Sequence, residues 1–140
     1  MSDLKAAGAI CYIQDGKRTL FLILRSSKHG EWGPPKGHAD EGETEVETAS
    51  RELFEEAGIR RARFEPGFRE VLNYSVEKKG KTHDKEVIYF LCELETDAVK
   101  LSHEHNEAHM ATLDEIDVLI PHGDMKNVFH KAMKHIKSKV

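Results

Sequence analysis

The segment from Gly37 to Ile59 constrains the fold more than any other part of the sequence, because it contains a helix whose ends and inner face can be read from the residues. Thr44 and Glu47 have the spacing of a capping box, and Gly58 suits the left-handed conformation that ends many helices. We therefore expect a helix over Thr44–Ala57. On a helical wheel one stripe of this helix faces the core, and it comprises Val46, Ala49, Ser50, Leu53 and Ala57.

Three acidic side chains, Glu52, Glu55 and Glu56, crowd a neighbouring arc of the same helix. Like charges three and four residues apart destabilise a helix by roughly 0.2–0.5 kcal/mol each. A solvated acidic face is the ordinary interpretation, but these carboxylates lie beside the core-facing stripe rather than opposite it. Oxygen ligands in that position suit a hard divalent cation such as Mg²⁺. This ion uses few carboxylates, keeps several bound waters and coordinates the phosphates of a substrate. Arg51 can reach Glu55 one turn on or fold back toward Glu43.

Strand patterns precede and follow this helix. Apolar stretches at 6–13 and 19–25 flank Asp15-Gly16, a hairpin signal, and should form antiparallel neighbours. A second pair is expected at 68–76 and 86–94. The strand at 86–94 is apolar on consecutive positions, which indicates a central strand covered on both faces.

Polar and helical patterns complete the chain. A polar loop with Gly80 at its centre is expected over 77–85, between the second pair of strands. A short helix over Leu113–Leu119 should be stopped by Pro121, and a longer one should run from Asp124 to about Lys139, with apolar residues at helical spacing. At 140 residues the chain is expected to be a single domain over 1–140. The order of elements predicts an α/β/α sandwich with a central mixed sheet.

The charge and cysteine content exclude several classes of protein. With 21 basic and 25 acidic residues, the formal net charge of −4 gives no chain-wide attraction to nucleic acid or to an anionic membrane. Cys11 and Cys92 each lie in an apolar run, which indicates two buried thiols rather than a disulfide framework. No apolar run is long enough to span a bilayer and no leader pattern follows the charged start, so we expect a cytoplasmic protein without membrane partners.

The fixed positions of the acidic segment resemble the Nudix box of the Nudix hydrolases. Gly37 is followed after five residues by Glu43, and after seven more by Arg51-Glu52-Leu53. One further residue separates these from Glu55-Glu56, and another precedes Gly58-Ile59. The resemblance implies an α/β/α Nudix fold and hydrolysis of a nucleoside diphosphate linked to another group. It also implies Mg²⁺, with Mn²⁺ as a substitute, bound by Glu52, Glu55, Glu56 and the Gly37 carbonyl.

Three further segments resemble the asymmetric diadenosine tetraphosphate hydrolases of that family: EWGPPKGH at 31–38, FREVLNY at 68–74 with KEVIYF at 85–90, and LSHEH at 101–105. This resemblance implies a dinucleoside polyphosphate as the small-molecule substrate, cleaved to ATP and AMP. Lys36 and His38 sit before the box, where cationic donors neutralise phosphate charge. The resemblance further implies that Tyr74 stacks on an adenine ring and that Lys85 contacts phosphate.

The general base has two candidates. Glu104 resembles the carboxylate beyond the box that completes the metal site or accepts the proton of the attacking water, and Glu52 is its rival. With Lys36, His38 and Arg51 these make up the expected catalytic set. His103 and His105 flank Glu104, but this pattern is only a weak zinc signal.

The sequence also departs from the resembled group. Gly30-Glu31 precedes Trp32 where His-His is common, so a phosphate or base contact is missing unless His29 replaces it. Met110 stands where a tryptophan is common, and His122 takes the place of the aromatic residue that forms the other side of the adenine clamp. These changes leave phosphate hydrolysis intact and bear on the choice of nucleobase.

Other functions remain open from the sequence. One alternative is a Nudix enzyme that acts on RNA 5′ ends, mononucleotides or inositol pyrophosphates; RNA is the less favoured partner, because the lysines of the last helix fit a solvated face. The other is a non-catalytic nucleotide sensor, which the complete set of glutamates disfavours. We expect a monomer or a weak dimer.

Overall fold

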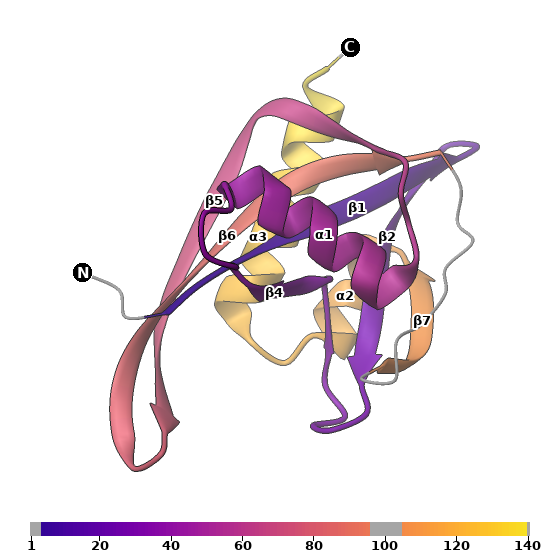
Figure 1. Ribbon diagram of the computed structural model, residues 1–140. Coiled ribbons are helices and arrows are strands. Elements are labelled where there is room, and N and C mark those ends of the chain that lie inside the picture. Colours follow the sequence, from indigo (N-terminus) through magenta and orange to yellow (C-terminus); the bar gives the residue numbers. More distant parts are fainter. Residues whose placement is uncertain (1–3, 96–104, 140) are drawn as a thin grey trace.

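The computed structural model describes residues 4–95 and 105–139. Its described residues form seven strands and three helices (Figure 1). The strands are β1 (Leu4–Asp15), β2 (Arg18–Ser26), β3 (Trp32–Gly33), β4 (Lys36–His38), β5 (Ala62–Lys78), β6 (Lys81–Leu94) and β7 (His105–Ala111). The helices are α1 (Glu45–Ala57), α2 (Leu113–Leu119) and α3 (Gly123–Lys137).

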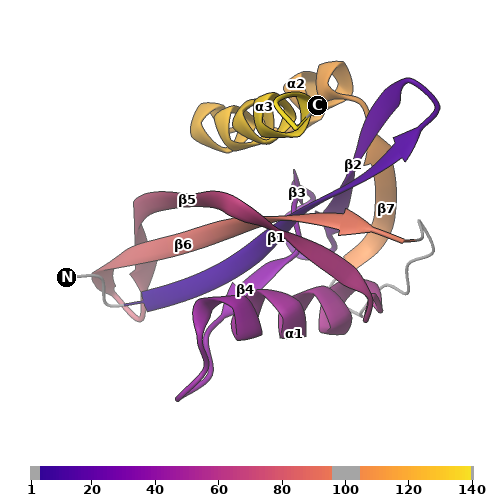
Figure 2. The same cartoon turned by 90° about the horizontal axis from the view of Figure 1, so that it is seen from above.

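The strands form one mixed sheet in the order β3-β2-β1-β6-β5, with β4 paired to β1 and β7 paired to β2. Among the described pairings only β1 and β6 run parallel. Helix α1 covers one face of the sheet, while α2 and α3 lie on the other (Figure 2). The expected α/β/α sandwich with a mixed sheet is confirmed, and β6 is the expected central strand, with Val87 to Tyr89, Leu91 and Cys92 buried.

Each face of the sheet has its own apolar core. Between the sheet and α3, Phe21 and Phe129 meet edge to face with ring centroids 5.5 Å apart. Between the sheet and α1, Leu53 packs with Cys11 and Cys92. Both cysteines are free and buried, as expected for structural thiols, and they are neighbours across the parallel β1–β6 pairing.

Helix α1 begins and ends as predicted, but its buried face is rotated. Thr44 caps the helix, the Thr44–Glu47 capping box is complete, and Gly58 adopts a left-handed conformation with φ 72°. The prediction was wrong for Val46 and Ser50, since Val46 is 44% exposed and Ser50 is also exposed. Besides Ala49, Leu53 and Ala57, the buried residues of the helix are Thr48 and Glu56. A wheel that counts only apolar residues misses them, because both are buried against polar partners.

The expected loop over 77–85 is also corrected. Strands β5 and β6 continue through it and pair as far as Lys78 and Lys81, so the turn consists of Lys79 and Gly80 alone. Both turn residues have positive φ, 53° and 74°, as the tight turns that suit the twist of a hairpin require. The segment looked like a loop because a hairpin that projects beyond the core needs no apolar residues.

Helices α2 and α3 lie within two residues of the predicted boundaries. The described helices include none that is long and apolar enough to cross a membrane.

Candidate active site

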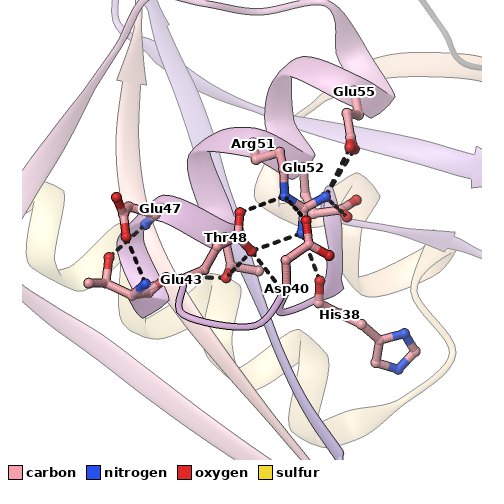
Figure 3. A network of polar contacts seen from close by, with 9 residues as sticks. His38, Asp40, Glu43, Glu47, Thr48, Arg51, Glu52 and Glu55 are labelled. Carbon is pink, nitrogen blue, oxygen red and sulfur yellow. Dashed lines mark hydrogen bonds and ion pairs between the residues drawn. The ribbon is translucent and has the colours of Figure 1, made fainter.

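Arg51 is the hub of the acidic segment (Figure 3). Its Nε donates to Glu43 Oε2 at 2.7 Å, and its Nη2 donates to the His38 carbonyl at 2.8 Å. Its Nη1 lies 2.9 Å from both Glu52 Oε1 and Glu55 Oε1. The two partners expected for Arg51 as alternatives, Glu43 and Glu55, are therefore bound together, and one guanidinium joins α1 to the loop that precedes it.

Glu43 closes this loop onto the helix. Besides Arg51, its carboxylate accepts hydrogen bonds from the Asp40 amide at 2.8 Å and from the hydroxyl of buried Thr48 at 2.9 Å. Arg51, then the Asp40 amide and Thr48, hold the pKa of Glu43 down at about 2. The carboxylates of Glu43, then Glu55 and Glu52, raise the pKa of Arg51 above its ordinary value. The loop is therefore fixed by charge at neutral pH.

Gly37 lies directly against Glu52. A Cβ atom added at Gly37 would stand 2.0 Å from Glu52 Cδ, which no side chain could accept without displacing the carboxylate. Glycine is thus required here by close approach rather than by its backbone conformation. This contact brings the backbone of β4 and the Glu52 carboxylate together, as expected for two predicted metal ligands.

Glu56 is held at the base of the site. Its side chain is 7% exposed, and its Oε1 accepts a hydrogen bond of 2.9 Å from the Lys36 amide. The bond fixes β4 against α1. Lys36 and Gly37 are neighbours in β4, so the bond also positions Gly37. Three of the predicted ligands, Gly37, Glu52 and Glu56, thereby meet at the β4–α1 contact.

The chemistry of the donor set, though not the arrangement of its side chains around Arg51, suits a hard divalent cation. Carboxylate oxygens of Glu52 and Glu55 already converge on one cationic centre, the Arg51 Nη1. Oxygen ligands of this kind are those that Mg²⁺ takes in proteins. Within the described part of the chain, no group of three or more His, Cys, Asp or Glu side chains is arranged to hold a metal ion. Glu104, the remaining predicted ligand and candidate base, lies outside the described residues, as does most of LSHEH.

A cleft opens beside Glu56. One part of it, about 610 Å³, is lined by Lys36, His38 and Glu56. The adjoining part, about 570 Å³, is lined by Lys36, Tyr74, Lys85 and His122. The structure thus brings together all five residues predicted to bind substrate, although they come from β4, β5, β6 and the start of α3. Trp32 lines both parts and also packs against the core.

Lysines set the electrostatics of this cleft. Burial, then the charges of Lys36 and Lys78, lower the pKa of Lys85 to about 8. Burial, then Lys85, Lys78 and Lys36, lower the pKa of His38. The Lys85 Nζ stands 5.9 Å from the centre of the Tyr74 ring. Besides burial, the mutual repulsion of these positive side chains lowers the pKa values of Lys85 and His38. A bound anion would relieve that repulsion.

Several residues of the site were not identified from the sequence. Thr48 and Asp40 support Glu43, and Asp124 lines the cleft beside Tyr74. Glu31, noted only as a departure, lies 3.3 Å from His122 between Oε2 and Nε2. The local signals were the spacing of Thr48 four residues after Thr44 and that of Asp40 three residues before Glu43, whereas the contacts of Glu31 and Asp124 join distant segments.

The acidic helix thus lies under a mixed sheet and next to a cleft lined with lysines, an arrangement that suits a phosphate-containing substrate. A NUDIX domain model matches residues 4–132, and the chain belongs to the Nudix family.

Relatives of known activity match nearly the whole chain. A bis(5′-nucleosyl)-tetraphosphatase [asymmetrical] of Sus scrofa is 37% identical and covers 96% of this chain and 97% of its own length. That of Rattus norvegicus is 40% identical with the same coverage. The crystal structure of a C. elegans Ap4A hydrolase binary complex superposes with a TM-score of 0.88 at 34% identity, covering 96% of this chain and 98% of the other.

Proposed function

We propose that this protein cleaves diadenosine tetraphosphate asymmetrically, to ATP and AMP. The observation that carries the proposal is the two-part cleft, in which Lys36 joins the part lined by Glu56 of α1 to the part lined by Tyr74 and Lys85. Curated relatives that are 36% to 40% identical to this chain carry the name of that activity.

The proposed cofactor is Mg²⁺, with Mn²⁺ as a substitute. Glu52, Glu55, Glu56 and the Gly37 carbonyl would hold it, with Glu104 from outside the described residues. When bound, such an ion supplies a Lewis acid and lowers the pKa of a coordinated water. Because Arg51 now shares Glu52 and Glu55, it would keep both carboxylates oriented and limit their mutual repulsion.

The other residues bind, orient and move protons. Lys36 and His38 would neutralise charge on the phosphate that is attacked, since they line the part of the cleft next to Glu56. Lys85 would hold a phosphate further along, and Tyr74 and His122 would enclose a base. Glu52 or Glu104 would accept the proton of the attacking water.

Product analysis tests the proposal directly. The protein is incubated with diadenosine tetraphosphate and Mg²⁺, and the products are separated; equal amounts of ATP and AMP are expected. Two molecules of ADP, or no turnover while nucleoside triphosphates are consumed quickly, would overturn it.

A pair of variants separates enzyme from sensor. Glu56→Gln keeps an oxygen that can accept the Lys36 amide but removes the charge, so it should abolish turnover and preserve nucleotide binding. Glu41→Gln makes the same change at an exposed loop position and should leave turnover intact. If the unaltered protein turned over no nucleotide, the sensor alternative would replace this proposal.

The expected partners follow from the same proposal. The substrate would be a small dinucleotide, and the protein would work in the cytoplasm as a monomer or a weak dimer. Two lysines of the α3 segment form ion pairs with acids of β5, Lys131 with Glu70 at 2.9 Å and Lys139 with Glu65. These two lysines anchor the helix, which weakens the case for α3 as an RNA-binding surface.

A further inference from the structure

The 570 Å³ part of the cleft is lined by side chains of both charges. Lys36 and Lys85 come from β4 and β6, and the proposed function assigns the phosphates to them. Glu31, His122 and Asp124 line the side formed by the β2–β3 loop and the start of α3. A carboxylate repels phosphate, so the acidic side must serve a different part of the substrate, and a nucleobase is the part that remains.

The two carboxylates of that side have different partners. Glu31 Oε2 lies 3.3 Å from His122 Nε2, so Glu31 is engaged in holding the His122 ring at the edge of the cleft. The Asp124 side chain is exposed and makes no hydrogen bond or ion pair with any other described residue. Asp124 is therefore the acceptor that a ligand can use.

Asp124 lines the same part of the cleft as the expected stacking surface, Tyr74, and as buried Tyr89. In agreement with this placement, the pKa of Tyr74 is raised first by burial and then by the negative charge of Asp124. A base stacked on Tyr74 would therefore occupy the space that the Asp124 carboxylate also borders.

The chemistry of a carboxylate selects among bases. An ionised carboxylate only accepts hydrogen bonds, through two adjacent oxygens. Guanine offers two adjacent donors, N1–H and the 2-amino group, and both bond to such a pair. Adenine offers the 6-amino donor next to N1, which is an acceptor and is repelled by the second oxygen. Hypoxanthine keeps N1–H but lacks the 2-amino group.

We propose that Asp124 reads the edge of the base bound against Tyr74 and makes guanine the preferred base at this subsite, while Glu31 positions His122 as the facing wall. The inference rests on the proposed function and makes dinucleoside tetraphosphates with at least one guanine the preferred substrates within its class. Diadenosine tetraphosphate remains a substrate, held by one hydrogen bond to Asp124 instead of two.

The test compares kcat/KM for diguanosine, diinosine and diadenosine tetraphosphates. Because a good bidentate contact to a base discriminates by roughly fivefold to a hundredfold, the diguanosine compound should exceed the other two by about tenfold. Asp124→Asn should reverse the order of guanine and adenine, since a carboxamide donates to adenine N1 and accepts from its 6-amino group. Asp114→Asn is the matched control; Asp114 occupies the first turn of α2 and does not line the cleft, so its ratios should stay unchanged.

The outcomes separate the two proposals. If all three compounds are hydrolysed and Asp124→Asn leaves the ratio of guanine to adenine unchanged, the inference about Asp124 is wrong and the proposed function stands. If none is hydrolysed, the proposed function fails. In that case calorimetric binding of the diguanosine and diadenosine compounds to the unaltered protein and to Asp124→Asn decides the inference: the same tenfold preference and reversal support it, and equal affinities overturn it.

Discussion

Gly37 leaves no room for a side chain beside the Glu52 carboxylate. Its Cβ in Gly37→Ala would stand 2.0 Å from Glu52 Cδ, so the Glu52 carboxylate must move. Because misplacing a reacting group by about 1 Å can cost roughly a hundredfold in rate, we expect kcat to fall by about that factor.

Gly33→Ala is the control for this substitution. Gly33 lies four residues earlier, and a Cβ there would meet nothing within 4 Å. We expect Gly33→Ala to change kcat less than twofold or so, within the range of neutral substitutions. Gly33 belongs to β3 and Gly37 to β4, so equal losses of kcat in the two variants would show a general effect of side chains on this segment rather than an effect of the Glu52 contact.

The lowered pKa of Lys85 predicts that kcat/KM falls and the free energy of unfolding rises as the pH increases above about 8. Its pKa in the folded protein is about 8, below the ordinary 10.5, with burial the largest cause. The ammonium that binds phosphate is therefore lost as the pH rises through about 8, and kcat/KM, which reports the free enzyme, should decline there. Between about 8 and 10.5 the unfolded chain holds the extra proton, so the free energy of unfolding should rise with pH over the same interval.

Lys85→Arg is the variant that tests this assignment. A guanidinium stays charged throughout this range, so the alkaline decline in kcat/KM should move beyond it. The measurement is a pH profile of kcat/KM for both proteins, beside urea unfolding of the unaltered protein. A decline at the same pH in Lys85→Arg would assign the titration to another group.

At the scale of elements, two helices carry the same capping box and allow a matched comparison. Thr44 caps α1 and Thr112 caps α2, each with a glutamate three residues on. Replacing either threonine by alanine should lower the free energy of unfolding by about 1 kcal/mol. Only Thr44→Ala should also lower kcat, because α1 carries Glu52, Glu55 and Glu56. Urea unfolding and initial rates measure both effects, and an equal loss of kcat in Thr112→Ala would contradict the assignment.

Helices were predictable here because their signals are local. The caps at Thr44 and Gly58 lie within the element they bound, so the sequence predicts α1 to within one residue. Strands β3 and β4 could not be predicted, since each is two or three residues long and is defined by its partner in β2 or β1. The β5–β6 turn was placed within too long a loop, because the pairing beyond Val76 has no apolar pattern.

The site was predictable to the extent that one helix carries it. Glu52, Glu55 and Glu56 follow from spacing, whereas the partner of His122 is Glu31, 91 residues away. Glu56 was expected on the acidic arc, but its burial depends on the Lys36 amide of another element. Asp124 and Tyr74 line the same cleft only because α3 packs on the sheet. These contacts depend on tertiary distance, which no spacing along the chain encodes.

At the scale of the whole molecule, an ion pair just beyond the C-terminal end of α3 joins this helix to the sheet, whereas the N-terminal end of α3 lines the cleft. Glu65 of β5 has a side chain only 2% exposed, and its Oε1 accepts a hydrogen bond of 2.6 Å from the Tyr12 hydroxyl of β1. The Lys139 ammonium, just beyond α3, contacts the same oxygen. Burial alone would raise the pKa of Glu65, but the bonds from Lys139 and Tyr12 outweigh it and lower that pKa. One buried carboxylate therefore joins β1, β5 and the C-terminal helix.

Lys139→Met should test this connection, because it leaves a buried carboxylate with Tyr12 as its remaining donor among these contacts. Removing one partner of a fully buried pair costs about 3–5 kcal/mol, and since the Lys139 side chain is 36% exposed we expect about 2 kcal/mol. Adding Glu65→Gln to Lys139→Met should recover most of the loss, which a double-mutant cycle in urea measures. A lowered pKa stabilises the fold above the ordinary value of 4.5, so the cost should vanish as the pH falls below it. Because Glu65 and Lys139 line neither part of the cleft, kcat should not change; a fall in kcat would instead show that the position of α3 controls the substrate side of the molecule.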